Sequence, residues 1–121
     1  MVSVVNSNAK GKVGERDWAE YLRGQGYEAR RGQQFCGSPD SPDVVSSVPG
    51  VHWEVKNVQS IQILAALEQA NSEKKEDEMG IVAFHKSNKP WVAILLMDDL
   101  MKLIKAAKPT EQQNPDLKVS P

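Results

Sequence analysis

The sequence predicts an α/β fold whose elements follow the order αβββαβ, with a further strand and helix toward the C-terminal end. Two kinds of pattern support this prediction. Apolar residues that recur every three or four positions indicate helices, and apolar residues that alternate or run together indicate strands. Glycine and proline pairs separate these segments. With 121 residues, the chain is long enough for one domain with a modest core.

The first half of the chain is predicted to hold one helix and three short strands. Helical periodicity covers Lys12–Gln25, and Gly26 is placed to end that helix. Residues 33–42 are rich in glycine, serine and proline and predict a loop, and Pro49-Gly50 predicts a turn. The strands are expected at Tyr27–Gly32, Asp43–Ser47 and Val51–Val58.

The second half is predicted to hold a helix, two strands and a final helix. Ser60 is a candidate N-cap for a helix over Ile61–Glu78, which Gly80 would close. Residues 87–90 predict a turn between the two strands. The last three elements are expected at Ile81–His85, Trp91–Met97 and Asp98–Lys108. One face of the last helix carries Leu100, Leu103, Ile104 and Ala107.

Composition limits where the protein acts. Residues 1–9 and 109–121 are expected to be flexible ends around one domain at 10–108. No stretch of about 18 apolar residues is present, so no membrane span is expected. The single cysteine, Cys36, has no partner for a disulfide within the chain. These features together predict a cytoplasmic protein.

The charge balance restricts how the protein can bind nucleic acid. The net charge of −1 argues mildly against a protein that coats nucleic acid, because such proteins carry a large basic excess. Any DNA-binding surface must therefore be local. The best candidates cluster early in the chain and are Lys10, Lys12, Arg16, Arg30 and Arg31.

Glu15 breaks the rule that carboxylates point to water. It lies in register with Trp18, Ala19 and Leu22, which form the apolar stripe of the first predicted helix. An acid near a helix N-terminus is also mildly stabilising without any further role. The position of Glu15 alone therefore does not separate a functional role from a structural one.

The third predicted strand has one polar face. Period-2 alternation places Val51, Trp53 and Val55 on one side, and His52, Glu54 and Lys56 on the other, with neighbours on a face roughly 7 Å apart. A strand at the edge of an antiparallel sheet would simply expose this polar side to water. The Glu-x-Lys pattern alone is therefore a weak signal of function.

An aspartate is predicted at the entry to the second strand. Pro42-Asp43 leads directly into Val44-Val45, whereas Asp40 is followed by a serine and another proline. We therefore prefer Asp43 to Asp40 as the functional residue, and Asp40 remains the alternative.

Three acids and one lysine suit phosphodiester hydrolysis. Mg²⁺ prefers carboxylate oxygens and keeps several water ligands. Asp43 and Glu54 from neighbouring strands, with Glu15 from a helix, can hold such an ion. Lys56 can orient the attacking water or meet the developing negative charge. Beside carboxylates an ammonium keeps its proton, so we expect an electrostatic role for Lys56 and not that of a general base.

These residues resemble the signature of a known nuclease group. Pro42-Asp43 followed by Glu54-Val55-Lys56 is similar to the PD-(D/E)-x-K motif of restriction-endonuclease-like nucleases. Residues 10–16, which read Lys-Gly-Lys-Val-Gly-Glu-Arg, resemble the opening of archaeal-type Holliday junction resolvases and their phage-encoded relatives. A helix ending Leu-Arg-Gly-Gln-Gly-Tyr and the pair Arg30-Arg31 extend the resemblance. It covers about residues 10–104.

The resemblance implies a restriction-endonuclease-like αβββαβ core around a central mixed sheet, with an additional C-terminal strand and helix. It implies that Glu15, Asp43 and Glu54 bind the metal and that Lys56 joins them in catalysis. Two accessory residues are also implied. Ser38 is the candidate for a serine near the scissile phosphate, and Gln69, or else Gln62, is the candidate for a glutamine near the site.

The functional prediction is a Mg²⁺-dependent endodeoxyribonuclease of DNA recombination and repair, for which Mn²⁺ can substitute. It would resolve four-way junctions by paired symmetric nicks as a homodimer, because one small subunit supplies one site. The dimer face is expected at Trp91, Ile94 or the last helix. The alternatives are a less selective nickase or repair nuclease, and a DNA-binding module without catalysis. The presence of all four site residues weighs against the last.

Three further features received structural interpretations. For His52 we prefer a peripheral, solvated position to a contact with a phosphate, which remains the alternative. The charged run at 73–78 is expected to be a solvated helix end. Cys36 is expected to be an incidental free thiol, since no Cys/His pairing is evident.

Overall fold

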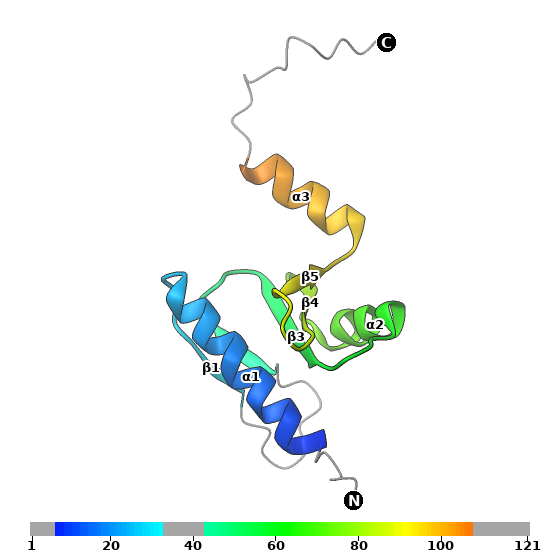
Figure 1. The fold of residues 1–121 in the computed structure, drawn as a ribbon. Coiled ribbons are helices and arrows are strands. Elements are labelled where there is room, and N and C mark those ends of the chain that lie inside the picture. The colour runs from blue at the N-terminus through cyan, green and yellow to red at the C-terminus, as the bar shows by residue number, and fades with distance from the viewer. Residues whose placement is uncertain (1–6, 33–42, 108–121) are drawn as a thin grey trace, which may run out of the picture.

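The computed structural model describes residues 7–32 and 43–107, with side chains from residue 11 onward (Figure 1). Within these residues the elements follow the predicted order, with the last strand and helix after the αβββαβ core. They are α1 (Ser7–Gly24), β1 (Ala29–Arg31), β2 (Val44–Ser46), β3 (Val51–Asn57), α2 (Ile63–Glu73), β4 (Met79–His85), β5 (Val92–Ile94) and α3 (Met97–Ala107).

The described strands form one mixed sheet in the order β1-β2-β3-β4-β5. β3 and β4 are parallel, from Val51 opposite Met79 to Asn57 opposite His85. The other three pairings are antiparallel. The parallel pair requires a crossover, and α2 supplies it. The prediction of an α/β fold with a central mixed sheet is therefore confirmed.

The two faces of the sheet are covered by different helices (Figure 1). α1 packs Trp18, Ala19 and Leu22 against one face, where Trp53 and Val55 project from β3. On the other face, the residues of the smaller apolar core are Ala66, Leu67, Ala70 and Val82. β3 is thus buried on both sides, as a central strand must be.

Two glycines allow the helices to approach the sheet closely. A Cβ atom on Gly14 would lie 2.5 Å from Cβ of Asn57, at the end of β3. A Cβ atom on Gly80 would lie 2.7 Å from the carbonyl carbon of Ala70 in α2. The prediction that Gly80 closes the preceding helix is wrong, because Gly80 lies within β4. Its role is to make room for the helix backbone.

Several element boundaries differ from those predicted. α1 begins at Ser7, five residues before the predicted start, so Gly11 and Gly14 are both accommodated inside the helix. Ser60 is not the N-cap of α2; Gln62 occupies that position and makes no capping hydrogen bond through its side chain. α2 ends at Glu73 and not at Glu78, because Lys74 has extended backbone angles. Strands β1, β2 and β5 are each shorter than predicted.

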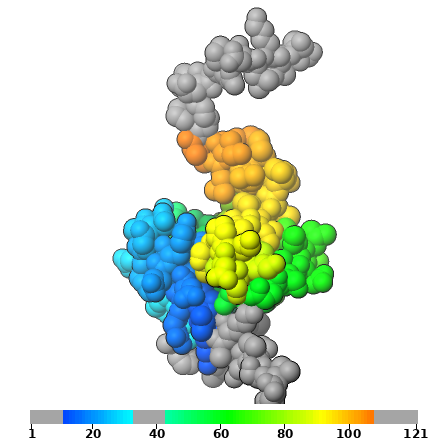
Figure 2. Space-filling view, viewed as in Figure 1, coloured from blue at the N-terminus to red at the C-terminus, as the bar shows by residue number. Residues whose placement is uncertain are grey.

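α3 extends away from the body of the molecule (Figures 1 and 2). The apolar residues predicted to share one face are present, but Leu103 and Ile104 are 40% and 47% exposed. Asp99 is buried near the start of this helix, whereas residues 101–107 are all exposed. Among the residues that the structure describes, no helix is both long and apolar enough to cross a membrane.

Candidate active site

The polar face of β3 is buried. His52 is 3% exposed and Glu54 is 2% exposed, less than the 8% of Trp53 on the apolar face. β3 is the middle one of the five described strands, which rules out the alternative of an edge strand with an exposed polar face. The expectation of a solvated His52 is wrong for the same reason. Burying ionisable groups is costly unless partners or ligands satisfy them.

Asp43 lies beside Glu54 at the point where β2 and β3 separate. The last backbone pairing between these strands is Val44 opposite Trp53. One residue further, a side chain replaces the backbone pairing: Oδ2 of Asp43 accepts a hydrogen bond of 2.8 Å from the backbone N–H of Val55. This bond fixes the Asp43 side chain against β3.

Lys56 connects the polar face of β3 to α2. Its Nζ lies 3.3 Å from Oε2 of Glu54 and donates a hydrogen bond of 3.1 Å to Oε1 of Gln69. Of the two glutamines considered from the sequence, Gln69 is therefore the one that contacts a site residue by a hydrogen bond. The second carboxylate oxygen of Glu54, Oε1, is buried and has no hydrogen-bond partner among the described residues.

Glu15 approaches from α1. Its side chain is 22% exposed, consistent with its register beside the buried Trp18. Nε of Arg31 donates a hydrogen bond of 3.0 Å to Oε1 of Glu15. Arg31, which we predicted to bind DNA, is therefore already engaged in an ion pair that orients Glu15. Its contact with DNA remains a prediction.

Acids from other elements raise the pKa values of Asp43 and Glu54. Burial, followed by the charges of Asp43 and Glu73, raises the pKa of Glu54 to about 8, while Lys56 partly lowers it. Burial also raises the pKa of Asp43, and the carboxylates of Glu15 and Glu73 add to this effect. Carboxylates crowded in this way favour a bound proton or a bound cation.

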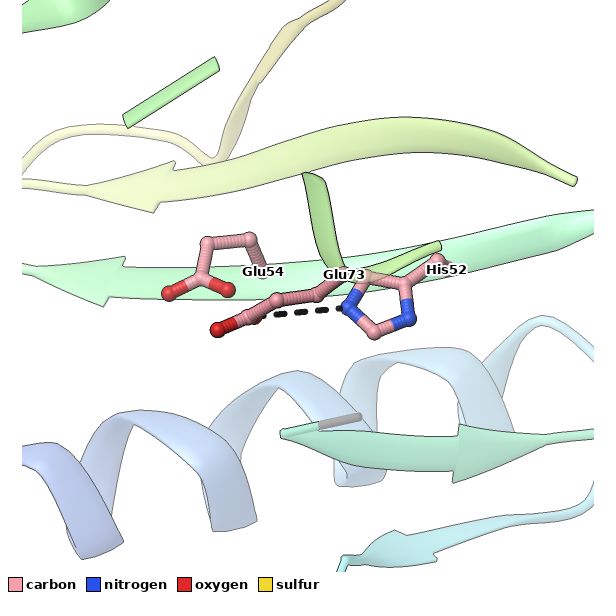
Figure 3. A group of neighbouring side chains, drawn as sticks. All are labelled: His52, Glu54 and Glu73. Atoms are coloured by element: carbon pink, nitrogen blue, oxygen red, sulfur yellow. Dashed lines mark ion pairs between the residues drawn. The ribbon is translucent and has the colours of Figure 1, made fainter. Parts of the chain in front are cut away.

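Glu73 is a site residue that the sequence reading missed. It was expected to belong to a solvated helix end, but it ends α2 beside β3, where its Oε1 lies 3.8 Å from Nε2 of His52 (Figure 3). His52, Glu54 and Glu73 each offer a ligand atom, and these atoms all lie within 4.8 Å of one another. The available signal was the four-residue spacing of Gln69 and Glu73, which places both on one side of a helix.

The donor set fits a divalent cation. Carboxylates from α1, from the residue before β2, from β3 and from α2 act on one another here. The basic side chains paired with them by described contacts are Lys56, Arg31 and His52. The unpartnered, buried Oε1 of Glu54 is an acceptor without a donor. A divalent cation could coordinate such an oxygen.

The remaining predicted residues make no described contact with the side chains of this cluster, or lie outside the described part. Lys12, Arg16 and Arg30 are exposed, as a DNA-contacting surface requires. Lys10 lies in α1, but its side chain is outside the described residues. The same holds for the loop candidates Ser38, Asp40 and Cys36. The choice of Asp43 over Asp40 therefore remains a prediction.

Comparisons with known proteins identify the family. A family model for the archaeal Holliday junction resolvase (Hjc) matches residues 6–120. Among solved structures, the chain is similar to Hjc of Archaeoglobus fulgidus, a Holliday junction resolvase from an archaeal hyperthermophile. That likeness has a TM-score of 0.54 and 24% sequence identity, and it covers 67% of this chain and 72% of the other, which shows the shared fold. No curated protein matches the chain. Because the family model covers nearly all of it, the chain belongs to the archaeal Holliday junction resolvase family and is a nuclease that resolves Holliday junctions.

Proposed function

We propose that this nuclease cleaves four-way DNA junctions at the described cluster, with Mg²⁺ held by Glu15, Asp43 and Glu54. The observation that carries this proposal is the buried Oε1 of Glu54, which has no hydrogen-bond partner among the described residues. Asp43 stands beside it and Glu15 acts on Asp43 through its charge. In a strand with a purely structural role, a buried carboxylate oxygen would be expected to have a hydrogen-bond partner.

The ligand chemistry favours a hard cation at this position. Three carboxylates from separate elements offer oxygen atoms, which Mg²⁺ and Mn²⁺ prefer. When bound, the ion supplies an activated water and charge to stabilise the transition state. The Arg31 ion pair restricts Glu15, and the Val55 hydrogen bond restricts Asp43, so both acids are held in place without the ion.

Lys56 meets the negative charge that develops on the cleaved phosphate. Its Nζ is held between Oε2 of Glu54 and Oε1 of Gln69, which aims the ammonium along the polar face of β3. A charged group fixed in this way needs no reorganisation during the reaction. Gln69 acts through Lys56 and is therefore a positioning residue.

DNA contacts come from exposed basic side chains near the acidic cluster. Lys12 and Arg16 project from α1, which also carries Glu15, and Arg30 projects from β1. Basic side chains bind the phosphate backbone without reading its sequence. This arrangement fits recognition of a junction by shape. A phage setting and a cytoplasmic location both remain predictions.

We infer that α3 forms the homodimer interface. Of the three predicted faces, Trp91 is already packed 4.9 Å from Trp18 between ring centroids, and Ile94 packs against the core of the α2 face. α3 instead exposes Met97, Met101 and Ile104 at helical spacing. Two copies joined by a two-fold axis would present two sites to the symmetric strands of a junction.

The first test is cleavage of synthetic four-way junction, linear duplex and flap DNA by the purified full chain. With Mg²⁺ we expect cutting of the junction at paired, symmetric positions, and with EDTA no cutting. Equal cutting of duplex and junction would favour a less selective nickase or repair nuclease. Junction binding without any cutting in Mg²⁺ or Mn²⁺ would favour a non-catalytic DNA-binding module.

The dimer is tested by sedimentation over a range of protein concentrations. The wild-type chain should sediment as a dimer, and Ile104→Glu should shift it to a monomer. Lys105→Ala, on the same helix, is the matched control and should leave the dimer intact. A wild-type chain that stays monomeric at micromolar concentration in the presence of junction DNA would contradict the two-fold arrangement.

A further inference from the structure

We propose that His52, Glu54 and Glu73 form a second cation site that binds a transition-metal dication, represented here by Zn²⁺. The three ligand atoms lie within 4.8 Å of one another on the α2 face of the sheet (Figure 3). This site goes beyond the proposed Mg²⁺ centre, with which it shares only Glu54.

The fold builds this cluster from one strand and the helix that packs on it. His52 and Glu54 are two residues apart on β3 and share a face. On α2, Gln69 contacts Lys56 and Glu73 approaches His52, so the helix runs in the direction opposite to the strand. Gln69 and Glu73 are about 6 Å apart along the helix axis, whereas Lys56 and His52 are about 13 Å apart along the strand. The long side chains of Lys56 and Glu73 span the difference. Glu73 is in this way placed over β3 by the same packing that places Gln69.

Two of the ligand atoms are buried without a partner. Nε2 of His52 and Oε1 of Glu54 have no hydrogen bond among the described residues, and both side chains are at least nine-tenths buried. The 3.8 Å between Nε2 of His52 and Oε1 of Glu73 is too long for a hydrogen bond. Unsatisfied buried polar atoms are costly, and a shared cation would satisfy both.

The donor types select the class of ion. An imidazole nitrogen with two carboxylates suits Zn²⁺ and similar transition metals, whereas Mg²⁺ favours oxygen ligands alone. A tetrahedral Zn²⁺ with bonds of about 2.0–2.2 Å holds its ligands about 3.4 Å apart. The separation of 3.8 Å between His52 and Glu73 therefore needs a shift of only a few tenths of an ångström. The two separations that involve Glu54 are within 4.8 Å and need a shift of at most about 1.4 Å. The side chain of Glu73 is 27% exposed, which leaves a path for the ion and for a water ligand.

The competing explanation is a simple ion pair between protonated His52 and Glu73. An ion pair would bring the same two side chains together and would leave Oε1 of Glu54 to the proposed Mg²⁺ centre. It also predicts no response of His52 to metal. The two explanations therefore differ in a property that can be measured on the imidazole ring.

The test is nitrogen NMR of the histidine rings during titration with Zn²⁺, using the full chain with Cys36→Ser to remove the thiol. The chain has only two histidines, so assignment is direct. We expect the Nε2 resonance of His52 to shift in a saturable manner at one equivalent of Zn²⁺. His85 serves as the internal reference, because its ring lies against Asn57 and Trp91. A His52 resonance that does not move at millimolar Zn²⁺ would overturn the proposal.

Variants then separate this site from the proposed Mg²⁺ centre. By calorimetry, His52→Gln and Glu73→Gln should each weaken Zn²⁺ binding by at least about tenfold, since even indirect partners of a metal contribute that much. Glu76→Gln, an exposed acid close to the end of α2, is the charge-matched control and should change nothing. Zn²⁺ binding by His52→Gln or Glu73→Gln as tight as in the wild type would also overturn the proposal.

Asp43→Asn distinguishes the failure of the two proposals. This variant should lose DNA cleavage while its His52 resonance still shifts with Zn²⁺, because Asp43 is not among the three ligands. Retained cleavage would contradict the proposed function alone. A His52 shift that disappears in Asp43→Asn would show that Zn²⁺ occupies the shared Mg²⁺ centre, and it would overturn the second site.

Discussion

The two faces of β3 are buried to a similar degree but are satisfied in different ways. On the α1 face, Trp53 packs against Trp18, and its only polar atom, Nε1, donates a hydrogen bond of 3.1 Å to Oγ of Ser46. On the α2 face, His52 and Glu54 are buried with ligand-capable atoms that lack partners among the described residues. The first face is arranged for stability and the second keeps binding capacity at a cost to stability.

Glu54→Gln should give the largest effect and would test the functional side of this comparison. Glutamine keeps the size of the side chain but cannot carry the charge that a metal ligand needs. We expect junction cleavage to fall by about 10³-fold or more, with little change in folding. Initial cleavage rates and circular dichroism measure the two effects. Cleavage near the wild-type rate would remove Glu54 from the site.

Trp53→Ala should lower stability and leave cleavage nearly unchanged, because Trp53 lies on the apolar face of β3. Removing this buried indole leaves a cavity between α1 and the sheet. The free energy of unfolding should decrease by about 3–5 kcal/mol, as measured by urea unfolding. Cleavage by the remaining folded fraction at low temperature should stay within a few-fold of wild type. A specific loss of cleavage at unchanged stability would contradict the division between the faces.

Lys56→Met should lie between these extremes. The variant keeps the apolar stem of the side chain and removes the ammonium held by Glu54 and Gln69. We expect the cleavage rate to fall by about 10²-fold with junction affinity nearly unchanged, measured by single-turnover kinetics and by electrophoretic binding. A matched loss in affinity alone would assign Lys56 to DNA binding.

The stability changes gradually with pH, and this dependence reports on Glu54 directly. In the folded chain its pKa is about 8, against 4.5 in the absence of neighbours. Between these values the unfolded chain has released a proton that the folded chain keeps, so stability should decrease as the pH rises. The slope is at most about 1.4 kcal/mol per pH unit. In EDTA, the unfolding temperature of the wild type should fall from pH 5 to 8, and Glu54→Gln should fall less.

The sequence was sufficient for the order of the elements and for the polar face of β3, because both depend on local periodicity. Apolar and polar residues alternate so regularly over residues 51–56 that the side chains sharing each face of β3 could be assigned from the sequence. The burial of that face could not, since it depends on which strands lie on either side. Only the pairing with β2 and β4 shows that β3 is central.

The role of Glu73 was missed for a different reason. The charged run that it begins indicates a solvated helix, and nothing local predicts that α2 ends there. The chain leaves the helix at Lys74 and turns, with the backbone N–H of Lys75 donating to Oε1 of Glu78. Glu73 becomes a site residue only through the packing of α2 on the sheet, which is a tertiary property. The ion pair between Arg31 and Glu15 was likewise not predicted, because the two residues are sixteen positions apart in the chain.

Gly80 gives the chain a way to adjust the centre without changing any side chain that acts there. Because a methyl group at this position would meet the backbone of Ala70, the depth at which α2 rests depends on a single hydrogen atom. Any larger residue would lift Gln69 and Glu73 together, while Glu15 and Asp43, carried by other elements, would stay where they are. A position that contacts none of the site side chains can thus move two of them, Gln69 and Glu73, together.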